Sequence, residues 1–511
     1  MSIMTPTLPD ILAWLQVQTP IAQLSSDSRS IKLGDIFFAY PGDAADGRSY
    51  IDAAIENGAK AIVYEAQGFT WNAALKVPHL AVTDLQKHAG EIAGAYYAHP
   101  DADMFVVAVT GTNGKTSCTQ WIGSALSQLG EPTAVIGTLG VGLYNQGLHG
   151  EFQPTGYTTP DAVLLQRHLA EMRDAGAKAL AIEASSIGLH QGRMNGLHCD
   201  VALFTNFTRD HLDYHGDMAA YEAAKTALFN WPGLKHAIVN LDDPMGLRLV
   251  EYLKKTAPSV AIIGTTLTNQ IVQGITVLYA NDIRMSQIGT TFHLTSPSGT
   301  SIVKTQLVGQ FNVSNAIGIV GVLLAKSVPW RTAIDSIELL TAVPGRMQQL
   351  GGNDAPLVVI DYAHTPDALE KTLDALRPIA EERNGQLWCV FGCGGDRDPG
   401  KRAQMGAASL VADHVIVTSD NPRSENPADI IAQIVAGMQA TSEQQADIQT
   451  YEDRAAAILS AVKHAGKQDV ILLAGKGHET TQEIKGRKLS FLDADHAALA
   501  LAARATMKGA H

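Results

Sequence analysis

The pattern of apolar positions predicts a chain in which short buried strands alternate with helices. After residue 104, five apolar runs are continuous rather than alternating, at 105–109, 179–184, 201–204, 237–240 and 260–263. Continuous runs of this length are typical of parallel strands that are covered by helices on both faces. We therefore predict an α/β domain with a mostly parallel sheet over this part of the chain.

The pattern changes on both sides of this segment. Before it, short strands at 35–40 and 61–64 precede a helix that runs to Tyr97, and His99-Pro100 then indicates a linker. Farther along, residues 271–307 are rich in β-branched residues and turns, which is typical of an antiparallel appendage.

After Val343-Pro344-Gly345-Arg346 the alternation restarts, with apolar strands at 357–360, 387–391, 414–417 and 469–473. The length of 511 residues also favours several domains. The expected organisation is a small N-terminal α/β domain at 1–102, a central α/β domain with a mostly parallel sheet at 103–341 and a Rossmann-like α/β domain at 342–511. A glycine loop in the central domain makes it a candidate P-loop mononucleotide-binding domain.

An apolar strand runs directly into a glycine loop that ends in Lys-Thr, and the apolar spacing after Cys118 predicts a helix behind the loop. The glycines would let backbone N–H groups converge on phosphate oxygens, while Lys115 neutralises charge and the Thr116 hydroxyl ligates Mg²⁺. A turn without a ligand is the alternative. The predicted nucleoside triphosphate loop comprises Gly111, Thr112, Asn113, Gly114, Lys115, Thr116 and Ser117.

Composition narrows the classes of partner. With 46% apolar and 17% charged residues the chain is typical of a globular protein, and its net charge of −13 argues against nucleic acid as a partner. No apolar run approaches the ~20 residues of a membrane span and no secretory leader is evident, so we expect a cytoplasmic protein without a membrane partner. Four cysteines are too few for a disulfide framework and should be reduced.

Polar residues cluster where several predicted strands end, which is where open α/β sheets bind ligands. Glu183 closes a buried strand, and a carboxylate there needs a cation such as Mg²⁺. The run Asp420-Asn421-Pro422-Arg423 combines an acid, an amide and a forked guanidinium, which suits an amino acid that carries carboxylate and ammonium groups. A polar loop without a ligand remains the alternative for this run.

Asp217 can cap a helix at 218–229 that places Tyr221 and Lys225 one turn apart on one face. On the residues alone, Lys225 is an exposed helical lysine. His211 lies in a polar loop after another strand. A histidine at that position is equally compatible with a metal-ligand role and with a solvated side chain.

Taken together, these motifs resemble the Mur ligases of peptidoglycan synthesis, in order and over nearly the whole chain. The matching runs are Gly111 to Thr116, Glu183-Ala184-Ser185-Ser186, Arg209 to Gly216, Tyr221 to Lys225, Asp361 to Pro366 and Gly475 to Glu479. The run Asp420 to Arg423 is similar to the signature of the branch that adds meso-diaminopimelate, whereas lysine-adding relatives usually differ at Arg423.

The resemblance implies an ATP-dependent amide ligase with ATP, Mg²⁺, UDP-N-acetylmuramoyl-L-alanyl-D-glutamate and meso-diaminopimelate as its small-molecule partners. It implies that Lys115, Glu183, His211 and Lys225 are catalytic, that Lys225 is carbamylated, and that Thr116, Glu183, His211 and the carbamate lie on or near Mg²⁺.

The resemblance also implies binding roles. Further ATP-side residues are Asn312, Arg346, Asp361 and His364. The nucleotide-sugar would contact Ser26, Ser28, Thr158, Thr159, Ser185, Gln191 and Arg193, and diaminopimelate would contact Arg397, Asp420, Asn421, Pro422, Arg423, Gly475 and Glu479.

Two positions depart from the family pattern, Tyr157 where Asn is common and Ser26 where Leu is common. The alternatives are a lysine-adding or folylpolyglutamate-type ligase of the same fold, an ATP-hydrolysing regulator without a peptide product, and a structural interaction protein. We expect a monomer whose C-terminal domain closes over the nucleotide.

Overall fold

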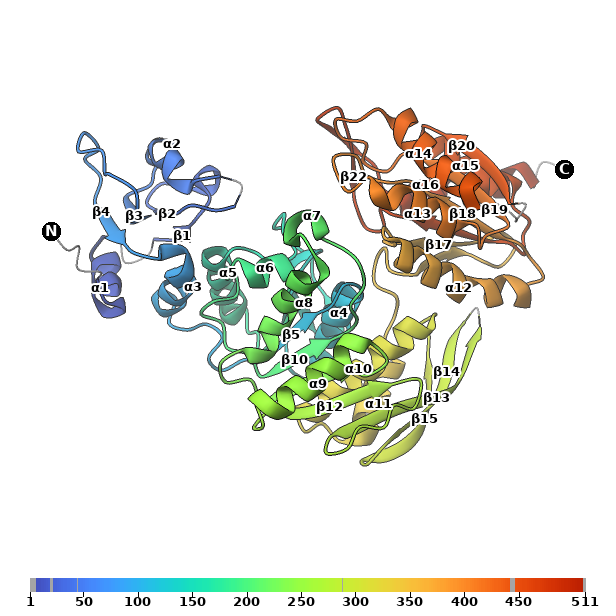
Figure 1. The fold of residues 1–511 in the computed structure, drawn as a ribbon, viewed down its shortest axis with the longest axis horizontal. Coiled ribbons are helices and arrows are strands. Elements are labelled where there is room, and N and C mark those ends of the chain that lie inside the picture. The colour runs from blue at the N-terminus through green and yellow to red at the C-terminus, as the bar shows by residue number, and fades with distance from the viewer. Residues whose placement is uncertain (1–5, 19–21, 44, 287, 442–445, 509–511) are drawn as a thin grey trace.

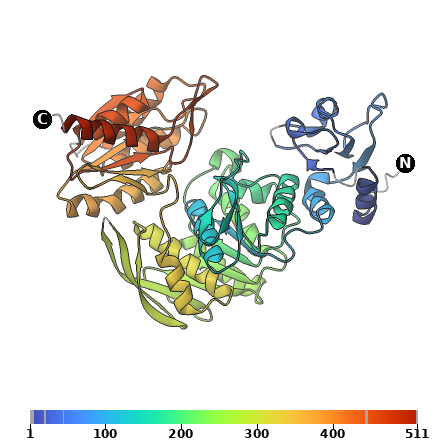
Figure 2. The same ribbon diagram turned by 180° about the vertical axis from the view of Figure 1, so that it is seen from behind.

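In the computed structural model the chain forms three α/β units in a row, and the structure describes residues 6–18, 22–43, 45–286, 288–441 and 446–508. The central unit lies between the other two, which do not meet each other in either view (Figures 1 and 2). Each unit contains its own sheet, of four, eleven and six strands, in agreement with three α/β domains. The limits of these domains, at 102/103 and 341/342, stay predictions.

The N-terminal unit contains a four-stranded sheet in which all neighbours are parallel. Its strands are β1 (Leu24–Ser25), β2 (Ile36–Ala39), β3 (Ala61–Glu65) and β4 (His79–Val82), and its helices are α1 (Leu8–Gln18), α2 (Ile51–Glu56) and α3 (Leu85–Tyr96). Helix α3 packs against α5 (Ala162–Asp174) of the central unit, so it connects the two units physically as well as along the chain (Figure 1).

The central sheet has the order β15-β14-β13-β12-β11-β10-β5-β9-β6-β7-β8, and the pairs from β13 to β6 are parallel. Its strands are β5 (Phe105–Thr110), β6 (Thr133–Gly137), β7 (Gly140–Asn145), β8 (Leu148–His149), β9 (Ala179–Glu183), β10 (Val201–Phe204), β11 (His236–Asn240), β12 (Ala261–Thr266), β13 (Thr276–Ser286), β14 (Gly289–Ser296) and β15 (Gly299–Thr305). The parallel core confirms the prediction from the continuous apolar runs.

Helices cover both faces of this sheet. They are α4 (Lys115–Gln128), α5 (Ala162–Asp174), α6 (Ser186–His190), α7 (Leu212–His215), α8 (Met218–Thr226), α9 (Pro244–Thr256), α10 (Gln310–Ala325) and α11 (Trp330–Glu338). Successive residues of β5 pack into different layers, since Val107 joins the core under α4 and α10 while Val106 joins the core under α5 and α9. A strand buried on both faces needs this continuous apolar sequence.

The segment at 271–307 is antiparallel as predicted, but it is no separate appendage. Strand β13 pairs in parallel with β12, so β13, β14 and β15 extend the main sheet. At the opposite edge, β7 and β8 add an antiparallel hairpin that the apolar pattern did not predict.

The C-terminal unit has the strand order β16-β17-β21-β18-β19-β20, parallel except for β16, with a separate hairpin of β22 and β23. The strands are β16 (Gln348–Gly351), β17 (Leu357–Asp361), β18 (Leu387–Phe391), β19 (His414–Thr418), β20 (Asp447–Tyr451), β21 (Val470–Ala474), β22 (Thr481–Ile484) and β23 (Arg487–Ser490). The helices are α12 (Pro366–Glu382), α13 (Gly400–Ser409), α14 (Pro427–Thr441), α15 (Arg454–His464) and α16 (Asp493–Lys508).

In the described parts of the chain, no helix combines the length and apolar character that crossing a membrane requires. All four cysteines are buried and unpaired. Burial raises the pKa of the Cys393 thiol to about 12, which is the behaviour of a structural thiol rather than a reactive one.

Candidate active site

The glycine loop lies where the carboxyl ends of three parallel strands meet. Strand β5 leads into it, β9 lies on one side and β10 on the other, and α4 begins at Lys115. The loop is fixed by the segment after β10, because the Asn113 N–H donates to Asn206 Oδ1 (2.9 Å) and the Thr205 hydroxyl donates to the Asn113 carbonyl (2.6 Å). This strand, loop and helix arrangement is the context that the predicted phosphate loop requires.

Position 111 requires glycine for two reasons, the backbone conformation and the lack of room for a side chain. Its φ is +149°, and a Cβ at this position would overlap the hydroxyl of Thr205. A side chain here would therefore displace the loop from the end of β10.

Two lysines converge on one carbonyl of this loop. Lys115 Nζ donates to the carbonyls of Gly111 and Thr112, at 2.8 Å each, and Lys225 Nζ donates to the same Gly111 carbonyl at 2.8 Å. Lys225 is 1% exposed and its Nζ lies 4.4 Å from the centroid of the Tyr221 ring. The interpretation of Lys225 as an exposed helical lysine, made on the residues alone, is therefore wrong, because α8 packs its Lys225 face against the loop.

Burial sets the protonation of this lysine pair. It lowers the pKa of Lys225 well below the ordinary value, and the nearby charge of Lys115 lowers it further. Burial also lowers the pKa of Lys115, while the charges of Glu183 and Asp210 oppose that shift. Lys225 is thus the member of the pair that gives up its proton more readily.

Glu183 ends β9 as predicted and is 1% exposed. Its carboxylate accepts hydrogen bonds from the backbone N–H (2.8 Å) and the hydroxyl (3.1 Å) of Thr138. Two donors on one side stabilise the buried carboxylate and orient it, and its charge reaches Lys115 across the loop.

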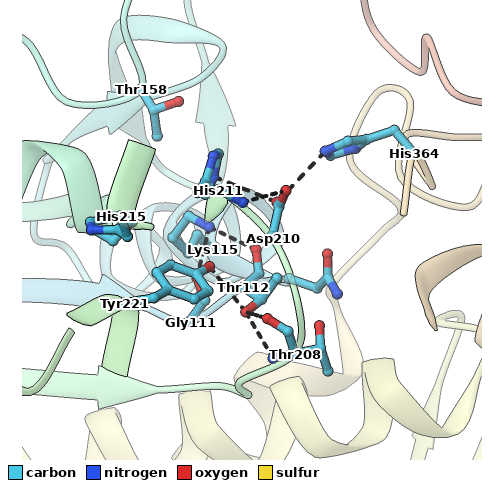
Figure 3. A network of polar contacts seen from close by, with 12 residues as sticks. Gly111, Thr112, Lys115, Thr158, Thr208, Asp210, His211, His215, Tyr221 and His364 are labelled. Carbon is cyan, nitrogen blue, oxygen red and sulfur yellow. Dashed lines mark hydrogen bonds and ion pairs between the residues drawn. The ribbon is translucent and has the colours of Figure 1, made fainter. Parts of the chain in front are cut away.

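A chain of hydroxyl contacts connects the loop with the segment that follows β10 (Figure 3). Thr112 Oγ1 donates to the Thr208 carbonyl (3.1 Å), accepts from the Thr208 N–H (3.0 Å) and lies 3.2 Å from the Tyr221 hydroxyl. Residues 209–211 follow directly, so the position of Asp210 and His211 depends on the position of the phosphate loop.

Asp210 lies between histidines of two domains (Figure 3). Its Oδ2 is 3.5 Å from His211 Nε2 and 4.0 Å from His364 Nε2, which comes from the C-terminal unit. Burial alone would raise the pKa of Asp210, yet in the acidic range where this carboxylate titrates the positive charges of protonated His211 and His364 and of Lys401 hold its pKa below the ordinary value. Burial lowers the pKa of His364 to about 4 and also lowers that of His211, so both imidazoles are neutral near pH 7.

A second contact between these domains is made by Arg346, whose NH2 donates to Thr116 Oγ1 at 3.1 Å. The guanidinium lies over the Tyr362 ring, 4.4 Å from its centroid. Asp361, at the end of β17, accepts from the N–H groups of Met347 and Ala363 at 2.9 Å each and so holds the segment that carries Arg346. Burial raises the pKa of Asp361.

Asn312, which was predicted for the ATP side, lies on α10 and outside the phosphate loop. It is 5% exposed, and its amide donates to the Val308 carbonyl at 2.8 Å.

A cleft of about 490 Å³ lies between the central and C-terminal units. Its central wall is the segment 209–213 together with Ile187. The facing wall contains, among others, Tyr362, His364, Arg397, Lys401, Asp420, Asn421, Arg423, Gly475 and Glu479. Six of the seven residues predicted for the amino acid are therefore gathered at one place, opposite His211, whereas Pro422 is buried behind the wall and does not line the cleft.

In the facing wall, the partly exposed Asn421 and Glu479 form a polar network with the buried Lys476. Lys476 Nζ donates to Glu479 Oε2 (2.8 Å), to Asn421 Oδ1 (3.3 Å) and to the Thr481 carbonyl (2.8 Å), and Asn421 Nδ2 donates to Glu479 Oε2 (2.8 Å). Burial would raise the pKa of Glu479, but Lys476 and Asn421 hold it below its usual range. Burial raises the pKa of Asp420 beside them.

The residues predicted for the nucleotide-sugar lie on two domains. Thr159, Ser185, Gln191 and Arg193 form one network, in which Arg193 donates to Gln191 Oε1 (2.7 Å) and to the Thr159 carbonyl (2.8 Å), and Thr159 Oγ1 lies 2.8 Å from Ser185 Oγ. Thr158 lies beside them, 3.2 Å from the hydroxyl of Thr138.

Ser26 and Ser28 belong to the N-terminal unit, and within the part of the chain that the structure describes no hydrogen bond joins them to this network. Ser26 lies near the network, because Tyr40 forms a hydrogen bond with Ser26 and the pKa of Tyr40 responds to the charges of Asp161 and Arg193. Gln191 also crosses between the two domains, since its amide donates to Asp43 in the loop after β2.

Several residues with a place in the site were not assigned from the sequence. Asp210 and Lys401 line the cleft, and Asp43 accepts from the Tyr214 hydroxyl at 2.6 Å. Asp210 precedes the assigned His211 in the sequence, so this position could have indicated that Asp210 belongs to the site. Lys401 and Asp43 lie in segments with no distinctive spacing, and only the packing of the domains brings them to the site.

Comparison with known proteins agrees with this geometry. Residues 20–97 match the Mur ligase family catalytic domain, residues 109–323 match the Mur ligase middle domain, and residues 345–477 match the Mur ligase glutamate ligase domain.

Related proteins match over the full length. The chain is 66% identical over 511 residues, all of both chains, to the UDP-N-acetylmuramoyl-L-alanyl-D-glutamate–2,6-diaminopimelate ligase of Janthinobacterium sp. (strain Marseille). It is 45% identical to the ligase of the same name from Pseudomonas aeruginosa, with 94% of this chain and 95% of the relative covered. A solved structure of a ligase of this name matches with a TM-score of 0.66 and 36% identity, covering 94% of this chain and 95% of the other. The chain therefore belongs to the Mur ligase family.

Proposed function

We propose that this protein joins meso-diaminopimelate to the D-glutamyl carboxylate of UDP-N-acetylmuramoyl-L-alanyl-D-glutamate, with hydrolysis of ATP to ADP and phosphate. The observation that carries the proposal is the cleft, in which Arg423, Asn421 and Glu479 face the segment after β10. That segment is bonded to the phosphate loop through Thr112 and Thr208. The 66% identity over the full chain supports the same function.

The reaction has two steps. The D-glutamyl carboxylate attacks the γ-phosphorus of ATP, the bond to the bridging oxygen breaks, and ADP leaves with that electron pair. The amine of diaminopimelate then attacks the acyl carbon, phosphate leaves, and the amine loses a proton. Lys115 stabilises the negative charge that develops on the phosphoryl oxygens, and Arg346 binds at the same end of the loop beside Thr116.

The neutral imidazole of His211 provides a proton acceptor near the cleft, because burial lowers its pKa. His364 is similarly neutral on the other side of Asp210. Asn312 and Asp361 act on the nucleotide side by holding α10 and the segment of Arg346.

Mg²⁺ fits the donors at the phosphate loop, because Thr116 and Glu183 offer buried oxygen ligands of the kind that this ion prefers. Among the described residues, no three His, Cys, Asp or Glu side chains gather to bind a metal by themselves, so phosphate oxygens would complete the set. The ion would neutralise charge on the phosphates. Lys225 fits as a carbamate, since its low pKa favours the neutral amine that reacts with CO₂ and the adduct replaces a cation with an oxygen ligand. His211 would lie near the ion.

The nucleotide-sugar would span the first two domains, with Ser26 and Ser28 at its uridine end and Thr158, Thr159, Ser185, Gln191 and Arg193 along the dipeptide. In the cleft, Arg423 would pair with the distal carboxylate of diaminopimelate while Asp420, Asn421 and Glu479 bind polar and cationic groups. Arg397 and Gly475 would complete the wall, and Pro422 would fix the turn that presents Arg423. We further infer a monomer, since one chain supplies residues for each of the substrates. We also infer a cytoplasmic location, because the reaction consumes ATP.

The test is an amino-acid panel. Purified protein is supplied with ATP, Mg²⁺ and the UDP-linked dipeptide acid, and phosphate release is measured with meso-diaminopimelate, L-lysine, L-glutamate or no amino acid. Release that depends on diaminopimelate, at least 100-fold above lysine in kcat/KM, supports the proposal. Equal release with lysine or without any amino acid contradicts it. The molar mass of the same sample, measured by light scattering, tests whether the protein is a monomer.

A further inference from the structure

The surroundings of the Arg423 guanidinium are asymmetric. NH1 donates to the Gly395 carbonyl at 2.6 Å, and Nε lies 3.9 Å from Oε2 of Glu483. NH2 forms no hydrogen bond or ion pair with the described residues, and Arg423 lines the cleft. The NH2 edge of the guanidinium is thus available to an incoming carboxylate, whereas the carboxylate of Glu483 lies beside the Nε edge.

The hairpin of β22 and β23 positions Arg423 through its backbone. The Arg423 N–H donates to the Glu483 carbonyl (3.0 Å), and the Lys485 N–H donates to the Arg423 carbonyl (2.6 Å). These two bonds form a parallel bridge that holds Arg423 at a φ of +52°. At 3.9 Å the Glu483 carboxylate is too distant for a hydrogen bond, so its side chain acts on Arg423 mainly through charge.

Glu483 differs in this respect from Asp396, another carboxylate near Arg423. The carboxylate of Asp396 accepts two hydrogen bonds from Ser424, at 2.6 and 3.1 Å. The carboxylate of Glu483 accepts none from the described residues, and its side chain is 33% exposed. Lys488 lies opposite Glu483 on β23, but among the described residues the one ion pair of the Glu483 carboxylate is with Arg423, so its negative charge opposes a second anion that approaches Arg423.

We propose that Glu483 is a positioning and specificity residue that makes Arg423 select a distal amino-acid group over a bare distal carboxylate. A carboxylate alone is repelled by Glu483 as it pairs with Arg423. A distal group that also carries an ammonium has no net charge, and its ammonium is attracted by the same carboxylate. The inference rests on the proposed function, and it names what the cleft accepts at the far end of the amino acid.

The test compares two amino acids that share a carbon chain. meso-Diaminopimelate has a distal ammonium and 2-aminopimelate lacks it, and kcat/KM is measured for both with the wild type and with Glu483→Gln, which retains the shape of the side chain. We expect a three- to fivefold gain with 2-aminopimelate, seen in KM rather than kcat, and no gain with diaminopimelate. The matched control is Glu382→Gln on the exposed end of α12, which should change neither value.

The same substitution is repeated in an Arg423→Ala background, at millimolar amino acid, where the gain should disappear. An unchanged selectivity ratio in a folded, active Glu483→Gln protein overturns the inference. An equal loss with both amino acids, or a gain that persists without Arg423, also overturns it. If the wild type forms no product with diaminopimelate, the proposed function fails first, so the two failures are distinguishable.

Discussion

Lys115 and Lys225 donate to the same oxygen, the carbonyl of Gly111, at 2.8 Å each. Two ammonium groups on one acceptor repel each other, and Lys225 is the more deeply buried of the two. The arrangement favours loss of the proton from Lys225, which leaves an amine that can react with CO₂.

Lys225 leads to the first prediction. Lys225→Ala should reduce kcat at least 100-fold, because it removes the proposed oxygen ligand, and added bicarbonate should not restore activity. A short carboxylic acid such as formate or acetate should restore part of it by filling the space left by the carbamate. Lys115→Ala is the control, since no added acid replaces its cation. Full activity of Lys225→Ala without any additive would reject the carbamate.

Arg423 leads to the second prediction. Arg423→Ala should raise KM for diaminopimelate about 100-fold, because a charge-assisted pair to a carboxylate contributes about 2–3 kcal/mol. The affinity for an ATP analogue, measured by calorimetry, should change less than twofold, because Arg423 lies on the cleft wall and not on the phosphate loop. A similar loss in both measurements would indicate misfolding of the C-terminal domain instead.

The third prediction concerns closure. Arg346 bonds to Thr116 across the domain junction, and Asp210 approaches His364 there. An ATP analogue together with the UDP-linked acid should draw the C-terminal domain inward and reduce the radius of gyration in small-angle scattering. Arg346→Ala should weaken this change, whereas Arg331→Ala, an exposed arginine on α11, should not. Identical curves with and without the ligands would contradict closure.

The fourth prediction concerns how the free energy of unfolding depends on pH through His198, a residue outside the cleft. His198 lies 2.8 Å from Asp101 and 3.3 Å from Asp200, and hydrogen bonds to these carboxylates raise its pKa to about 9. Because the folded pKa is above the unfolded value, this stabilisation is complete below about pH 6.5 and is lost as the pH rises through 9.

After an allowance for solvent screening at this partly exposed site, His198→Ala should lower the free energy of unfolding by about 1–2 kcal/mol at pH 6. The difference from the wild type should be much smaller at pH 10. Urea denaturation at both values checks this. A difference that is the same at both pH values would show that packing, not charge, is the cause.

Much of the fold could be predicted because local patterns determine it. The continuous apolar runs predicted the parallel strands, and Asp217 caps α8 through the Ala220 N–H as its position suggested. The hairpin of β7 and β8 escaped prediction because edge strands carry weak patterns, and β8 is exposed.

The site was less accessible to prediction from the residues themselves. Lys225 is an ordinary helical lysine until the phosphate loop packs over it, and that contact joins residues 114 positions apart. The cleft depends on how two domains face each other, which no local pattern encodes. Family resemblance supplied the roles of Lys225 and Arg423, and these roles stay predictions.

The most direct measurement is mass spectrometry of the nucleotide product after incubation with ATP, Mg²⁺, the UDP-linked dipeptide acid and an equimolar mixture of meso-diaminopimelate and L-lysine. The account predicts a single new species, the UDP-linked tripeptide with diaminopimelate, formed in equal amount to the phosphate released. A lysine adduct of similar abundance, or phosphate without any new peptide bond, would contradict it.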